Sequence, residues 1–236
     1  MSRSYSIEGI EMPSVTTILD CLGKGDALLY WAVNMACQYI EVNAGLGLTI
    51  PELCRKAKTG WREAKEDAAA IGSEVHDMIE KYIKHGRDAV GNYKPEVERG
   101  FLAFLEWEKT HKVQWLQSEM EVYSIRKMFA GTLDAVAVID GKAYVVDFKT
   151  SSGFWDTFPL QIAAYKYAAK ERGVDSDGMM ILRLDKQTGV PEARDYSEQY
   201  EKSLNSFLKL TDFYYAFKSR RLKNNPRTKE NQLCHS

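Results

Sequence analysis

The chain has 236 residues, of which 44% are hydrophobic and 28% are charged, and its formal net charge is −1. This composition predicts one globular domain with a substantial core, or one domain with a helical extension, and no apolar run approaches the ~20 residues that a membrane-spanning helix needs. The near-zero charge gives no global signal for nucleic acid, so any affinity for DNA has to come from a local patch.

The first fourteen residues have neither the apolar core of a secretory signal nor the Arg-rich pattern of a transit peptide, so a cytoplasmic location is expected. The four cysteines, Cys21, Cys37, Cys54 and Cys234, show no C-x-x-C pairing or zinc spacing. Reduced thiols are therefore expected.

The first third of the chain is predicted to be mostly helical. Residues 13–36 indicate a short lead-in, capped by Ser14 or Thr16, and then a helix. Residues 43–60 contain three glycines and a proline, which predicts an irregular connection with a short helical piece.

Residues 64–84 carry an apolar stripe at helical spacing and are predicted to form an amphipathic helix. Gly72, His76 and Glu80 are four residues apart and share a neighbouring face of it. A lone histidine on a helix is usually a surface or core residue, so His76 has two interpretations at this point, structural residue or ligand. Glu80 is a weaker candidate.

A second helix is predicted over residues 95–111, followed by a strand over residues 115–124. Along this strand Glu119, Glu121 and Tyr123 alternate with residues of the opposite face. They form either an exposed strand face or one edge of a site.

The chain is organised around a predicted hairpin, in which Asp140-Gly141 joins two apolar, β-branched runs. A two-residue turn there pairs Ile139 with Lys142, and the same register sets Asp134 opposite Asp147. Lys149 falls on the same face as Asp147.

Two carboxylates whose Cβ atoms lie roughly 5 Å apart repel each other unless one is protonated or a cation lies between them. Oxygen ligands at this spacing suit Mg²⁺ or Mn²⁺, and a neighbouring lysine can hold a water or stabilise charge on a phosphate. The alternative is an accidental pair of acids on the surface of an edge hairpin.

A helix over residues 160–172 follows, with Gln161 and Tyr165 one turn apart, and residues 178–184 are predicted to form a buried strand parallel to the preceding one. A final helix is predicted over residues 197–217. The one dense basic run, a phosphate-binding patch or a solvated tail, comprises Lys218, Arg220, Arg221, Lys223, Arg227 and Lys229.

Four motifs carry a resemblance to a known family: GSEVH at residues 72–76, GTLD at 131–134, VDFKTS at 146–151 and LQIAAY at 160–165. In this order and at these distances they resemble the PD-(D/E)XK nuclease superfamily, in particular the RecB-type exonucleases of phages and their relatives. The resemblance implies an α/β fold with a restriction-endonuclease-like core in the order α-β-β-β-α-β. It places an N-terminal helical extension at 1–62, the core at 63–185 and a C-terminal helical region with the basic tail at 186–236, within a single nuclease domain.

The resemblance also implies roles. One or two Mg²⁺ or Mn²⁺ ions would be held by His76, Asp134, Asp147 and the backbone carbonyl of Phe148. Lys149 would orient a water and stabilise developing charge. Gln161 and Tyr165 would position the phosphodiester, with Thr150 and Ser151 as further phosphate contacts. A glutamate of the preceding strand contributes in many relatives; Glu119 matches its position, and Glu121 competes for it.

The implied function is a metal-dependent deoxyribonuclease, most simply an exonuclease with little sequence specificity, in a bacterium or a phage-infected cell. DNA, single- or double-stranded, would be its main partner, with a recombination or replication protein as a second. No iron–sulfur cluster is expected, because only Cys234 lies near the C-terminus, where such relatives carry three cysteines. The alternative is a non-catalytic module on the same fold that binds nucleic acid or protein. Polarity of degradation, exo- against endonuclease action, strand preference and oligomeric state stay open.

Overall fold

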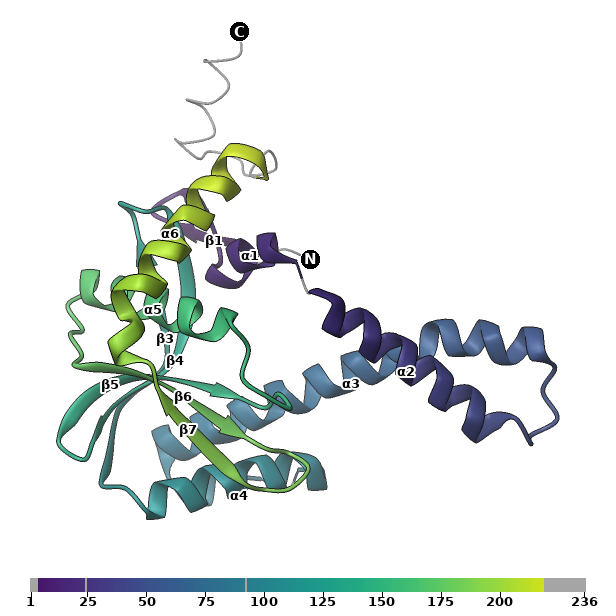
Figure 1. Ribbon diagram of the computed structural model, residues 1–236. Coiled ribbons are helices and arrows are strands. Elements are labelled where there is room, and N and C mark those ends of the chain that lie inside the picture. Colours follow the sequence, from purple (N-terminus) through teal and green to yellow (C-terminus); the bar gives the residue numbers. More distant parts are fainter. Residues whose placement is uncertain (1–3, 24, 92, 219–236) are drawn as a thin grey trace, which may run out of the picture. The chain divides into compact units, whose positions relative to one another are not determined.

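The computed structural model describes residues 4–23, 25–91 and 93–218 (Figure 1). Contacts divide the chain into two compact units, one made of Met1–Cys21 with Val75–Ser236 and the other of Leu22–Glu74. The single nuclease domain stays a prediction.

The larger unit is built on a five-stranded mixed sheet. Its strands lie in chain order, and every neighbouring pair is antiparallel except β5 and β6, which are parallel. The strands are β3 (Val113–Ser124), β4 (Phe129–Ile139), β5 (Lys142–Lys149), β6 (Gly178–Leu184) and β7 (Pro191–Asp195). The α/β class and the parallel pairing around the crossover helix are confirmed.

The predicted hairpin register is confirmed as well. Ile139 pairs with Lys142, and the ladder runs to the pair formed by Ala135 and Val146. Asp140 and Gly141 both have positive φ, 49° and 86°, as a type I′ turn requires.

Helices cover both faces of the sheet (Figure 1). On one face, α5 (Thr157–Glu171) and α6 (Tyr200–Phe217) pack into a core formed by apolar strand and helix residues. On the other face, the Phe104 ring of α4 (Pro95–Lys109) contacts the rings of Phe148 and Trp115. The sheet is therefore buried on both faces, which explains why β4 and β5 are apolar on both.

The N-terminal segment completes the first of these cores. It contains β1 (Ser4–Ile7) paired with β2 (Ile10–Pro13), then α1 (Val15–Leu19) and a 3-10 turn at Asp20–Leu22. The Thr17 amide donates to Ser14 Oγ at 2.9 Å, so Ser14 is the cap that the sequence predicted as one of two. Residues that the sequence placed in a helical extension thus join the sheet core.

The smaller unit consists of α2 (Gly25–Asn43) and of α3 (Ile50–His85) up to Glu74. The predicted irregular connection over residues 43–60 was wrong from Ile50 onward. The Glu52 carboxylate accepts hydrogen bonds from the amide and hydroxyl of Thr49, at 2.9 and 2.7 Å, as in a capping box. Pro51 lies in the first turn, where a missing N–H costs nothing. The pattern Thr49-x-x-Glu52 was the signal for this helix start.

The sheet also continues past residue 185, where the predicted core ended, because β7 pairs with β6. This strand is a short, partly exposed edge with charged residues, so its sequence lacks a clear alternation. Short 3-10 helices occupy Arg87–Ala89 and Ser197–Gln199.

Of the predicted basic run only Lys218 is described; Arg220, Arg221, Lys223, Arg227 and Lys229 lie outside the described residues, as does Cys234. In the part of the chain that is described, every helix is too short or too polar to cross a membrane.

Candidate metal centre

Three acidic residues stand at the same level on three neighbouring strands. Ser118 pairs with Ala135 and Met120 with Leu133, so the register sets Glu119 of β3 opposite Asp134 of β4. The hairpin register in turn sets Asp134 opposite Asp147 of β5. This row of carboxylates crosses the sheet where β4 and β5 separate.

The strands separate there because an aspartate side chain takes the place of a backbone partner. The ladder of β4 and β5 ends one pair before Asp134 and Asp147, and Asp134 Oδ2 accepts a hydrogen bond from the Phe148 amide at 2.7 Å. Glu119 departs from strand geometry too, with φ of 51°, a value uncommon for a residue other than glycine. Backbone strain of this kind is found preferentially at functional sites.

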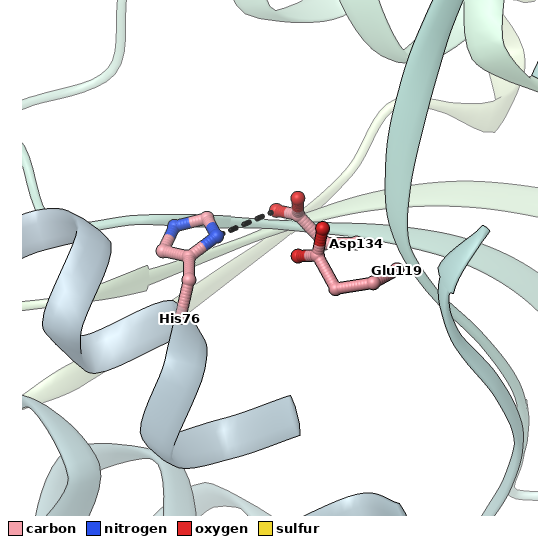
Figure 2. Close-up of side chains that lie close together, drawn as sticks. All are labelled: His76, Glu119 and Asp134. Atoms are coloured by element: carbon pink, nitrogen blue, oxygen red, sulfur yellow. Dashed lines mark ion pairs between the residues drawn. The ribbon is translucent and has the colours of Figure 1, made fainter. Parts of the chain in front are cut away.

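His76 of α3 joins two of these acids (Figure 2). Its Nδ1 lies 3.5 Å from Asp134 Oδ2, and its ring meets the Phe148 ring edge-on with centroids 6.1 Å apart. His76, Glu119 and Asp134 each offer one possible ligand atom, and these three atoms lie within 4.8 Å of one another. Such a group can hold a metal ion.

Asp147 faces a second set of partners. Lys149 Nζ lies 2.6 Å from Asp147 Oδ2 and donates to Gln161 Oε1 at 3.1 Å. Gln161 Nε2 donates to Asp147 Oδ1 at 3.2 Å and to the Tyr165 hydroxyl at 3.1 Å. The Lys149 ammonium also lies 5.1 Å from the centre of the Phe158 ring. The lysine is thus fixed by a carboxylate, an amide and an aromatic face.

The glycine of the GTLD motif has a steric reason. A Cβ on Gly131 would lie 2.5 Å from Cε1 of Tyr165, closer than carbon atoms can approach. The Tyr165 ring occupies that space and is 5% exposed. Gly131 therefore lets α5 bring Tyr165 against β4, where it meets Gln161.

Burial and mutual repulsion set the charges of the acids. Burial would raise the pKa of Asp134, but His76, Lys149 and the Phe148 amide outweigh it, so the pKa is lowered. Burial likewise opposes the charge on His76, yet Asp134 and then Asp147 raise the pKa of this imidazole. Asp134 and His76 thus form an ion pair.

The other two carboxylates lack full compensation. Burial, with the nearby Asp134 charge, raises the pKa of Asp147 to about 6 despite Lys149. Burial and Asp134 raise the pKa of Glu119 to about 7. The Lys149–Asp147 contact is an ion pair of 2.6 Å, and within the described residues the buried Asp147 Oδ2 has no hydrogen-bond partner beside this ammonium.

These observations fit a divalent cation. Among the described residues, the three carboxylates face two cationic side chains, the His76 imidazole and the Lys149 ammonium, and the Glu80–Lys84 pair near Glu119 adds one charge of each sign. Hard oxygen donors with one imidazole suit Mg²⁺ and Mn²⁺. A bound dication would allow Glu119 and Asp147 to ionise together.

The sequence-predicted residues His76, Glu119, Asp134, Asp147, Lys149, Gln161 and Tyr165 are brought together in this way. Of the two competing glutamates, Glu119 lies in the group, whereas Glu121 is exposed. Glu80 pairs with Lys84 and stands outside the three-residue group.

The remaining predictions have different outcomes. Ser151 donates its hydroxyl proton to the Gly153 carbonyl of its own loop at 2.7 Å, and Thr150 is half-buried beside it. For Phe148, the amide is tied to Asp134, and its carbonyl as a ligand stays a prediction. Sequence reasoning missed Phe158, for which no local signal exists because its contact with Lys149 depends on how α5 packs.

Comparison with protein-family models and with curated proteins finds no match to this chain. Membership of a nuclease family therefore stays a prediction drawn from the motifs.

Proposed function

We propose that this protein is a metal-dependent phosphodiesterase that hydrolyses DNA. The observation that carries the proposal is the row Glu119, Asp134 and Asp147 on adjacent strands, with the Lys149 ammonium 2.6 Å from the last of them. Paired carboxylates beside a lysine, at one end of a sheet, are a suitable arrangement for metal-assisted attack on a phosphate.

His76, Glu119 and Asp134 would hold the ion, and Asp147, whose Oδ2 is paired with the Lys149 ammonium, would complete the ligand set from the neighbouring strand. A divalent ion at this position supplies Lewis acidity to a phosphoryl oxygen and lowers the pKa of a water. The contact with Asp134 turns Nδ1 of the His76 imidazole toward the acids (Figure 2), so this nitrogen, on a neutral ring, would be the atom that faces the ion.

Lys149 and α5 would act on the substrate. The ammonium is held in place by Asp147 and Gln161 and is the cation that can stabilise charge developing on the phosphate. The Tyr165 hydroxyl accepts from Gln161, so its own proton is available to a phosphate oxygen. Contacts of this kind position the backbone and carry no sequence information, so little sequence preference is expected.

The resemblance to RecB-type enzymes favours hydrolysis from a DNA end. The test is release of nucleotides from end-labelled linear DNA, beside circular DNA, with Mg²⁺, with Mn²⁺ and with a chelator. Attack from ends predicts that the linear substrate is degraded and that the intact circle is spared.

The matched pair of variants is Glu119→Gln and Glu121→Gln, which remove the same charge two residues apart on one strand. We expect Glu119→Gln to lower the cleavage rate by about two orders of magnitude, the usual loss when one member of a metal centre or its orienting shell is removed. Glu121→Gln should cleave like the wild type. Equal activity of all three proteins would refute the assigned site, and metal-independent binding without cleavage would favour the non-catalytic binding module.

A further inference from the structure

The smaller unit carries a stripe of four basic residues that the proposed metal centre does not use. Arg55, Lys58, Arg62 and Lys65 follow one another at spacings of three, four and three residues along α3, so they lie on one side of the helix. All four are exposed. We call this set the basic stripe.

The charges of the basic stripe are not matched by acidic partners. Within residues 4–23, 25–91 and 93–218, none of the four forms an ion pair, and Arg62 merely stands beside the Trp61 ring, 5.5 Å from its centre. Glu63 and Asp67 lie roughly 120° or more around the helix from the middle of the stripe. Glu66 borders it beside Arg62.

The rest of the same helix shows what an ordinary solvated face looks like. There Asp77 pairs with Lys81 and Glu80 pairs with Lys84, each four residues apart. In the stripe, Lys58 and Arg62 have the same sign at this spacing, which destabilises a helix. A like-charged row inside a chain of net charge −1 therefore calls for an anionic partner.

We propose that the basic stripe binds the sugar-phosphate backbone of a nucleic acid. From Arg55 to Lys65 there are ten helical steps, about 15 Å at 1.5 Å per residue, which matches about four phosphate steps of one strand at 3.4 Å per step along a duplex. Between the basic residues, Ala57, Thr59, Gly60 and Ala64 are small and Trp61 is the one large apolar side chain, whereas a membrane-binding helix would place several large apolar residues beside the charges.

This inference deepens the proposed function, because it rests on DNA being the substrate and adds a second surface that holds it. The stripe supplies affinity and salt dependence, while the metal centre supplies the chemistry. The arrangement explains how a chain without net positive charge can bind a polyanion.

The test measures binding without cleavage, by anisotropy of labelled DNA in chelator with Asp134→Asn as the background. The stripe variant changes Arg55, Lys58, Arg62 and Lys65 to Gln, a good helix former. The control variant changes four exposed lysines of other elements, Lys109, Lys142, Lys170 and Lys209, to Gln and so removes the same charge.

Affinity for DNA falls as salt rises, and we expect the plot of log affinity against log salt to be less steep for the stripe variant by about 3.6, since each phosphate contact contributes about 0.9. At about 0.1 M salt its affinity should fall at least about a hundredfold, and that of the control variant much less. Each single substitution should lower the slope by about 1, which keeps the test valid if the quadruple variant folds poorly.

Equal slopes for the stripe and control variants, or no DNA binding by the background protein, would overturn the inference. So would a stripe variant that loses affinity for anionic vesicles but keeps it for DNA. Hydrolysis of a small chromogenic phosphodiester with Mn²⁺ separates the two proposals. If the stripe variant hydrolyses this small substrate as fast as the wild type but binds DNA more weakly, the inference is supported. If the stripe variant loses DNA binding and the wild type hydrolyses no substrate, the inference is still supported and only the proposed function is refuted.

Discussion

Glu119→Gln should stabilise the metal-free protein at alkaline pH. Burial and the Asp134 charge raise the pKa of Glu119 in the folded chain to about 7 from the ordinary 4.5. The folded state therefore holds this proton more tightly than the unfolded state. As the pH rises from about 4.5 through 7, ionisation of Glu119 lowers the free energy of unfolding. Gln has the shape of the protonated acid and no such dependence.

The size of the effect follows from the two pKa values. A fully buried group with this difference would cost about 3 kcal/mol at about pH 8.5. Glu119 keeps contact with solvent, which screens its repulsion from Asp134, so we expect about 1.5 kcal/mol. The gain of the Gln variant should shrink to a few tenths of a kcal/mol at about pH 5 and vanish near pH 4.

Urea unfolding in chelator at these pH values measures the difference, with Glu121→Gln as the control on the same strand. The control should match the wild type throughout, because Glu121 is exposed. A gain that is the same at all pH values, or a Glu119→Gln variant that is less stable than the wild type at about pH 8.5, would refute the electrostatic reasoning. With added Mn²⁺ the wild type should become more stable than Glu119→Gln, because the ion binds the wild type more tightly and so stabilises it more.

Three further predictions concern neighbouring residues. Lys149→Met removes the cation beside the buried Asp147 and should cost about 3 kcal/mol at about pH 8 by urea unfolding, with most of the loss recovered when Asp147→Asn is added. Gly131→Ala should displace the Tyr165 ring and cost about 1–3 kcal/mol, with an added Tyr165→Leu relieving part of it; additive losses would contradict the close approach. Mn²⁺ at a hundredfold excess over its dissociation constant should stabilise the wild type by about 2.7 kcal/mol in thermal unfolding, and Asp134→Asn, whose amide oxygen can still accept from Phe148, should lose this gain.

Local signals predicted the hairpin that builds the site. Asp140-Gly141 specifies a two-residue turn, and that turn alone fixes which residues of β4 and β5 face each other. Gln161 and Tyr165 follow in the same way from helical spacing. These parts of the site depend on contacts close in sequence, where pattern and structure are directly linked.

The position of Glu119 could not be fixed in this way. Alternation puts Glu119 and Glu121 on one strand face, and the choice between them depends on the register of β3 against β4. That register shifts at an irregularity between Trp115 and Gln117, and Glu119 itself takes a left-handed φ that its residue type does not favour. Neither feature has a signature in the sequence, because each is imposed by packing of the whole sheet.

The balance of charge favours the proposed metal site over a purely structural network. A structural network would satisfy each buried acid, yet Glu119 and Asp147 both have raised pKa values beside the Asp134–His76 pair. Two cationic side chains stand against three carboxylates, so the folded chain is left short of positive charge at one point. For this reason a substitution expected to disable the site should also make the empty protein more stable, a combination that a purely structural role for Glu119 does not predict.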